Sequence, residues 1–125
     1  MLFRSVRDQG RDDAALTLSQ AAERTSAADD IDTQALWRSI RAPILARAGS
    51  MAEAEAMARS AVELSRETDA LPLQADTLSE LASVLKIAGR IDETRKVIDA
   101  AIVIYRAKGD VVSTARSTAW ASSLA

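Results

Sequence analysis

The sequence contains no cysteine and no histidine, only two prolines and four glycines, and only four aromatic residues (two Trp, one Tyr and one Phe). Without cysteine, the chain has no disulfide framework, no thiolate nucleophile and no cysteine-ligated metal. Without histidine, it lacks the usual general base and the commonest zinc ligand. We therefore expect no catalytic residue, no metal site and no cofactor, and we predict that the protein is not an enzyme.

No strong charge of either sign and no long apolar run is present. The 16 basic and 18 acidic residues leave a net charge of -2, which argues against a nucleic-acid or anionic-membrane partner. No stretch approaches the roughly 18 to 20 apolar residues that cross a bilayer. Residues 1–8 become charged too early for a secretory signal. The sequence thus predicts a cytoplasmic protein, and its 125 residues suit one compact domain.

What the chain has in abundance is helix-forming residues, chiefly alanine, leucine, glutamate and arginine. Apolar residues recur at intervals of three and four along most of it, the pattern of one buried face on an α-helix. An all-α fold is therefore predicted, with seven helices at about residues 1–9, 11–26, 33–48, 51–68, 72–88, 91–108 and 111–123.

Three glycines mark an internal repeat. Gly10, Gly49 and Gly89 recur at nearly equal intervals, and each stands between two apolar-periodic runs. Glycine is typical of a helix end that requires a positive φ. Each glycine is followed by small residues at offsets of 5 and 12, which would let two helices pack closely: Ala15 and Ala22, Ala54 and Ala61, Thr94 and Ala101. A helix–turn–helix unit with a period near 40 is typical of a solenoid.

Capping residues agree with these boundaries. Ser50 and Glu53 have the spacing of a capping box, and Asp110 is a candidate N-cap. The acidic run 29–32 lacks the glycine and the terminal glutamate of a calcium loop, so we interpret it as a cap for the helix that begins at Thr33.

The third repeat resembles the tetratricopeptide (TPR) motif. The matching residues, with Ala75 as position 1, are Leu78, Leu81, Ala82, Leu85, Gly89, Ile98 and Ala101. Thr94 and Arg106 depart from the motif, and the period is longer than its usual one. Residues 34–49 and 81–90 are similar to the C-terminal helical arms of large bacterial regulators. Those proteins join an adenylate or guanylate cyclase, or a transcription-activator domain, to an ATPase.

This resemblance implies a right-handed α-α superhelix of antiparallel helix pairs. Residues 1–125 would form a single TPR-like domain that is out of phase with the repeat at both ends, as in a segment of a longer array. The implied function is a non-catalytic protein–protein interaction module, or scaffold, in bacterial signalling, with a protein or peptide partner. The alternative is a regulatory C-terminal segment of an adenylate cyclase or ATPase-type signalling protein.

The resemblance also implies an inner groove lined by the first helix of each pair. Its residues would be Leu36, Ser39, Pro43, Ala46 and Arg47, then Asp76, Ser79, Ser83, Lys86 and Ile87. Of these, Arg47, Ser79, Ser83 and Lys86 are candidate interaction residues. The chain contains no asparagine, which disfavours a carboxylate-clamp site for C-terminal peptides.

Arg38 and Arg41 stand beside Trp37, where the motif has large apolar residues. A buried guanidinium is costly unless it is paired. Either the two arginines form structural ion pairs, with Asp76, Glu80 or an acid of 29–32, or they anchor the carboxylate of a bound peptide.

Trp120 lies on the apolar face of the last predicted helix. An uncovered apolar face is a candidate association surface, so the exposed end helices are a possible site of homo-oligomer formation. Alternatively, Trp120 folds back on Ile98, Ile102 and Tyr105, which would leave a monomer.

Overall fold

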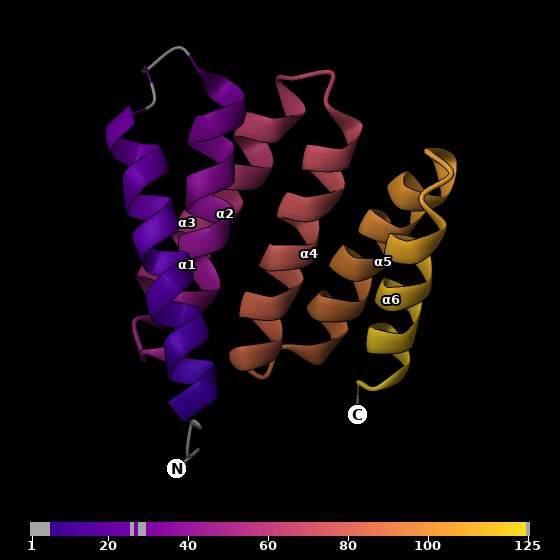
Figure 1. Ribbon diagram of the computed structural model, residues 1–125. Helices are drawn as coiled ribbons and strands as arrows, with labels where there is room; N and C mark the ends of the chain where they lie inside the picture. The colour runs from indigo at the N-terminus through magenta and orange to yellow at the C-terminus, as the bar shows by residue number, and fades with distance from the viewer. Residues whose placement is uncertain (1–5, 26, 28–29, 125) are drawn as a thin grey trace.

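The computed structural model describes residues 6–25, 27 and 30–124, with side chains from residue 10 onward. Within these residues the chain is all-α, as predicted, and contains six helices rather than seven (Figure 1). The helices are α1 (Val6–Thr25), α2 (Ile31–Arg47), α3 (Met51–Arg66), α4 (Leu71–Ile87), α5 (Ile91–Ala107) and α6 (Val111–Ser122).

The helices follow a regular spacing along the chain. The first residues of α2 to α6 fall at equal intervals: Ile31, Met51, Leu71, Ile91 and Val111. The repeat period that the glycines indicate spans two of these intervals and is therefore the length of one helix pair. Residues one period apart occupy equivalent places in successive pairs.

Three glycines end helices in the same way. Gly49, Gly89 and Gly109 have φ values of +94°, +78° and +72°. In each case the residue after the glycine donates its N–H to a carbonyl five positions earlier, over 2.9 to 3.0 Å. The glycine itself donates to a carbonyl three positions earlier. This is the Schellman arrangement, which satisfies carbonyls that the helix end leaves without partners.

Gly10 does not form such a turn, and the predicted break between helices 1–9 and 11–26 is wrong. α1 runs continuously through Gly10, while residues 1–5 lie outside the described part of the chain. After the turns at 49 and 89 the next helix opens on an apolar, half-buried residue, Met51 or Ile91. The equivalent residue after Gly10 is Asp12. With nothing apolar there to favour chain reversal, continued helical hydrogen bonding outweighs the roughly 1 kcal/mol that glycine costs inside a helix.

The predicted caps are confirmed at two of three helices. The Asp30 carboxylate accepts from the Thr33 N–H at 3.3 Å and caps α2. The Asp110 carboxylate accepts from the Ser113 N–H at 2.9 Å and caps α6. The capping box at Ser50 is wrong in its geometry, because Ser50 occupies the N-cap of α3 but its hydroxyl makes no capping bond.

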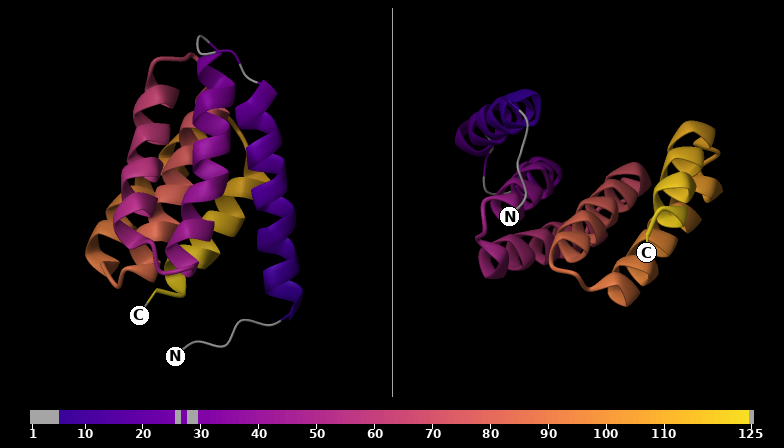
Figure 2. Two further views of the ribbon diagram at one scale, coloured as in Figure 1. Left: turned by 90° about the vertical axis from the view of Figure 1, so that its left-hand side faces the viewer. Right: turned by 90° about the horizontal axis from the view of Figure 1, so that it is seen from below.

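Seen along the helices, α2, α4 and α6 lie on one side of the molecule and α3 and α5 on the other (Figure 2). α4 packs against α2, α3 and α5, whereas α1 packs on α2. One buried apolar cluster joins α2, α3 and α4, and a second joins α4 and α5.

The small residues predicted to line the helix seams do so in two of the three repeats. Ala54, Ala61, Thr94 and Ala101 are all 0% exposed. By contrast, Ala15 and Ala22 of α1 are only half-buried. The alanine-rich composition therefore reflects close packing between helix pairs, and α1 does not share it.

Candidate functional site

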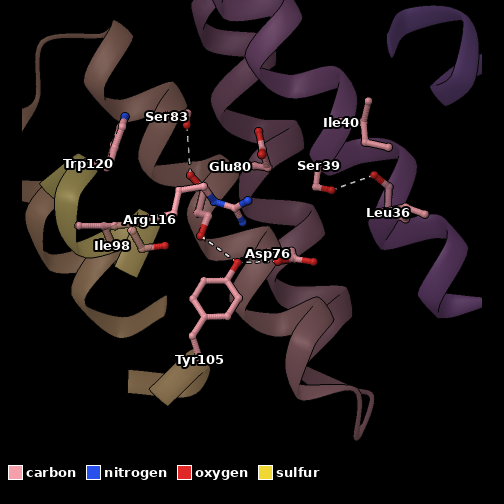
Figure 3. Close-up of a pocket in the computed structure, with 12 residues that line it drawn as sticks. Leu36, Ser39, Ile40, Asp76, Glu80, Ser83, Ile98, Tyr105, Arg116 and Trp120 are labelled. Carbon is pink, nitrogen blue, oxygen red and sulfur yellow. Dashed lines mark hydrogen bonds between the residues drawn. The ribbon is translucent and has the colours of Figure 1, made fainter. Parts of the chain in front are cut away.

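An open cavity of about 470 Å³ lies on the side of the molecule formed by α2, α4 and α6. We call it the central cavity. Its lining, much of it labelled in Figure 3, comes from four helices: Leu36, Ser39 and Ile40 of α2; Asp76, Ser79, Glu80 and Ser83 of α4; Ile98 and Tyr105 of α5; and Arg116, Ser117 and Trp120 of α6.

The repeat period explains why these side chains meet. Equivalent positions of α2, α4 and α6 carry Leu36, Asp76 and Arg116, and one turn further on they carry Ile40, Glu80 and Trp120. Residues four apart share one face of a helix. Each of the three helices therefore turns the same face toward the cavity, but with different chemistry: apolar on α2, acidic on α4, and cationic and aromatic on α6.

A hydrogen-bond network holds the Asp76 carboxylate in place. The Tyr105 hydroxyl donates to Asp76 Oδ1 at 2.5 Å and shares a second hydrogen bond with the Ser79 hydroxyl at 3.3 Å. Burial raises the pKa of Tyr105 to about 12, and the hydrogen bond to Asp76 acts in the same direction. Tyr105 is thus a neutral donor at physiological pH, and it holds the Asp76 carboxylate in place.

Glu80 differs from Asp76, although both line the cavity. Glu80 is half-buried, and its carboxyl group forms no hydrogen bond or ion pair within the described part of the chain. Burial raises the pKa of Glu80 to about 7; nearby Arg47 lowers it and Asp76 raises it further. Because desolvation disfavours the ionised form, Glu80 is partly protonated at neutral pH.

α6 supplies the opposite wall. Figure 3 shows Arg116 pointing from α6 into the cavity. Trp120 packs against the cluster that contains Ile98, Ile102 and Tyr105, so this indole folds back onto α5. The Lys86 ammonium lies 5.4 Å from the centre of the Trp120 ring, a cation–π distance.

Arg38 and Arg41 lie outside the central cavity and enclose Trp37. Their guanidinium carbons are 4.4 and 4.6 Å from the centre of its indole ring. Arg38 donates to both the backbone and the side-chain oxygen of Gln34 at 2.9 Å. These contacts favour a structural role for Arg38 over a role as an anchor for the carboxylate of a bound peptide.

Among the described residues, Arg41 has a different ion-pair partner from those expected; Asp29, one of the expected acids, lies outside that part of the chain. Arg41 pairs with Glu23 of α1 at 2.8 Å and donates to the Ser19 hydroxyl at 3.3 Å, rather than reaching the acids of α4. The expectation considered only the acids of α4 and of residues 29–32, and not those of the preceding helix, which lies alongside α2.

Arg47 also holds α1. Its guanidinium forms a two-point ion pair with Asp12, over 2.8 and 2.9 Å. Of the seven predicted interaction residues, Ser79, Ser83 and Trp120 line the central cavity and Lys86 contacts its indole wall. The other three, Arg38, Arg41 and Arg47 of α2, form the contacts described above with Trp37, Gln34 and α1.

Sequence reasoning did not place Glu80, Arg116 or Tyr105 at the groove. The Arg116 position could have been found, because it lies one repeat period after Asp76, a predicted groove residue. Glu80 occupies a helix position that the motif's groove pattern omits. Tyr105 reaches the cavity from α5, the second helix of its pair, and no spacing rule for first helices predicts that.

Among the described residues, no group of three or more Asp or Glu side chains is placed to hold a metal ion. Nor does any helix in that part of the chain have the length and apolar character needed to cross a membrane. What the cavity offers is charge, hydrogen-bonding groups and aromatic surface.

No protein-family model matches the chain, and neither curated proteins nor solved structures give a significant match. The TPR resemblance therefore remains a prediction that rests on the residues quoted above.

Proposed function

We propose that this protein is a non-catalytic interaction module of TPR type, a scaffold for bacterial signalling that binds a peptide segment of a partner protein in the central cavity. The observation that carries this proposal is the cavity itself, which opens between three equivalent helices and presents a mixed polar and apolar surface. Ligand-binding sites in proteins are commonly concave and combine apolar area with a few well-placed polar groups in this way.

The packing supports the finer proposal of a TPR-like superhelix. Helices start at equal intervals from α2 onward, and α4 contacts both helices of the preceding pair, α2 and α3. Stacking each pair on the one before is how solenoid proteins bury a continuous core. It also places α2 and α4, the first helices of two successive pairs, side by side, and the cavity opens between them and α6.

The alternative proposal is a regulatory segment of an adenylate cyclase or ATPase-type protein. The likeness of residues 34–49 and 81–90 to the helical arms of such regulators supports it. A reading frame that continues upstream into a cyclase or an ATPase would favour this alternative over an independent module.

Selection of peptides from a random display library tests the interaction proposal. We expect the selected peptides to bind the wild-type chain and to lose at least about tenfold in affinity for Ser83→Tyr, which fills the cavity from α4. Ala56→Tyr is the matched control, because it adds the same side chain on an exposed face of α3.

Thermal melts of both variants show whether they fold. Peptides that bind Ser83→Tyr and wild type equally, or a library that yields none, would overturn the cavity as the binding site. If Ser83→Tyr does not fold, Leu36→Arg, at an exposed position of α2 that lines the cavity, replaces it with the same expected loss.

A further inference from the structure

The chemistry of the central cavity specifies what kind of peptide would bind there; this inference rests on the proposed function. We propose that the partner segment carries a lysine or arginine, and that its cationic head enters the central cavity beside Asp76 and Glu80. The site would thus select a basic segment, the opposite charge from that taken by a carboxylate clamp.

The position of the two acids supports a cation between them. Asp76 and Glu80 are four residues apart on α4 and line the same cavity. Asp76 is held by the Tyr105 hydroxyl, so its place is set before any ligand arrives. Glu80 has no hydrogen-bond or ion-pair partner in the described structure. A carboxylate that is partly removed from water without a partner gains most when a cation is supplied.

The basic residues near the cavity do not neutralise its two acids. Arg47 makes a two-point ion pair with Asp12, and Lys86 lies over the Trp120 ring. Within the described lining, Arg116 is the only basic residue, against two acidic ones. Its guanidinium donates to the Ser113 hydroxyl of its own helix at 3.5 Å. The lining therefore keeps an excess of negative charge.

Apolar walls suit the rest of a long basic side chain. Leu36, Ile40 and Trp120 line the cavity on the two helices that flank α4. Lysine and arginine bury their methylene stems against such surface while the charged head reaches polar groups. An acidic or purely apolar side chain would leave Glu80 without a partner.

The proposal predicts how the affinity for a basic peptide changes with pH. The pKa of Glu80 is raised to about 7, and a cation binds its ionised form. Affinity for a basic peptide should therefore rise between pH 6 and pH 8. The other charged or titratable groups around it are Arg47 from α2, Asp76 from α4, Arg116 from α6 and Tyr105 from α5, whose pKa is about 12.

Three synthetic peptide pools test this inference. Each is a pool of nonapeptides, acetylated and amidated, with random flanks and a fixed central lysine, norleucine or glutamate. Binding is followed through the indole N–H signal of Trp120 in NMR titrations. The second tryptophan, Trp37, serves as an internal reference because it is buried between Arg38 and Arg41, away from the cavity.

We expect the lysine pool to bind at least about fivefold more tightly than the norleucine pool at pH 8, and the glutamate pool more weakly than both. Glu80→Gln should remove most of this preference and its pH dependence. It should fold, because glutamine resembles the protonated glutamate that the site already tolerates. Glu63→Gln, on an exposed face of α3, is the control and should retain the preference.

The possible failures are distinguishable. If all three pools bind equally and shift Trp120, a peptide site exists but the basic specificity is overturned. If Glu80→Gln keeps the full lysine preference, the assignment to Glu80 is overturned. If no pool moves the Trp120 signal, both this inference and the proposed function are overturned.

Discussion

The first helix and the middle of the helix stack are held in place by different forces. Among α2 to α5, apolar side chains are buried, such as Leu85 at 0% exposure in one cluster and Ile98 at 3% in the other. Between α1 and α2, two ion pairs are formed, Arg41 with Glu23 and Arg47 with Asp12. In the described side chains of α1 the buried residue is a serine, Ser19, while Leu18 is 61% exposed.

The difference shows which part of the stack is cooperative. Burial of apolar surface supplies most of the stability of a fold, whereas exposed ion pairs contribute about 0 to 1 kcal/mol each. We infer that α2 to α5 unfold as one unit and that α1 opens at lower cost, as local unfolding of weakly packed elements commonly does. The following substitutions test this contrast, from the largest expected effect to the smallest.

The strongest test places a charge in each region. Leu81 is 3% exposed and lies in the cluster that joins α2, α3 and α4. Leu81→Asp should reduce the free energy of unfolding by more than about 4 kcal/mol, because the carboxylate would be buried without a partner. Leu18→Asp, the same change on α1, should alter it by less than about 0.5 kcal/mol. Urea denaturation followed by circular dichroism measures both, and equal midpoints for the two variants would remove the contrast.

Glu80 makes the stability of the folded helix stack depend on pH. Its folded-state pKa is about 7, above the value of 4.5 expected for the unfolded chain. The folded state therefore holds this proton more tightly, so the contribution of Glu80 to stability falls as pH rises from about 4.5 to 7 and is constant above.

Glu80→Gln removes this dependence. We expect the variant to be more stable than wild type at pH 8, by up to about 3 kcal/mol, and similar to it at pH 4. The comparison of the two proteins cancels other carboxyl groups, such as Glu55, whose pKa is lowered mainly by hydrogen bonds from Arg59 and Arg90. Urea midpoints across this pH range provide the measurement. A variant that tracks wild type at every pH would show that Glu80 is not desolvated.

Removing one charge from the α1 contact should loosen α1 alone. Arg41→Met keeps the methylene stem but loses the bonds to Glu23 and Ser19, and we expect α1 to lose about 2 kcal/mol of protection. Hydrogen exchange should accelerate in α1 while the amides of α4 stay protected. Arg59→Met, which breaks exposed pairs with Glu55 and Glu93, is the matched control. Equal acceleration in α1 and α4 would mean that the stack unfolds as a single unit.

The sequence predicted a structural feature correctly where a single local cause determines that feature. Gly49 and Gly89 end helices because only glycine adopts their positive φ without strain, and Asp30 and Asp110 cap helices through their own side chains. The seam residues Ala54 and Ala101 were identified because close helix packing admits only small side chains. These features made the all-α fold and most helix boundaries predictable.

The central cavity was less predictable, because it depends on contacts between helices. The serines of α4 were found from helix periodicity alone. The hydrogen bond from Tyr105 to Asp76 joins two helices, and the partner of Arg41 depends on where α1 lies. Spacing rules describe one helix at a time and cannot supply such contacts.

The smallest predicted effect separates two glycines that look equivalent in the sequence. Gly10 lies within α1, whereas Gly89 has a φ of +78°, and a Cβ added at either would meet no atom within 4 Å. Gly10→Ala should stabilise α1 by about 0.5–1 kcal/mol, since alanine is the better helix former. Gly89→Ala should destabilise the stack by about 1 kcal/mol, because an L residue is strained at positive φ. Since space is available at both sites, the opposite signs would come from the backbone alone. Hydrogen exchange reports on α1 and urea midpoints on the stack; destabilisation by both substitutions would place a turn at Gly10 after all.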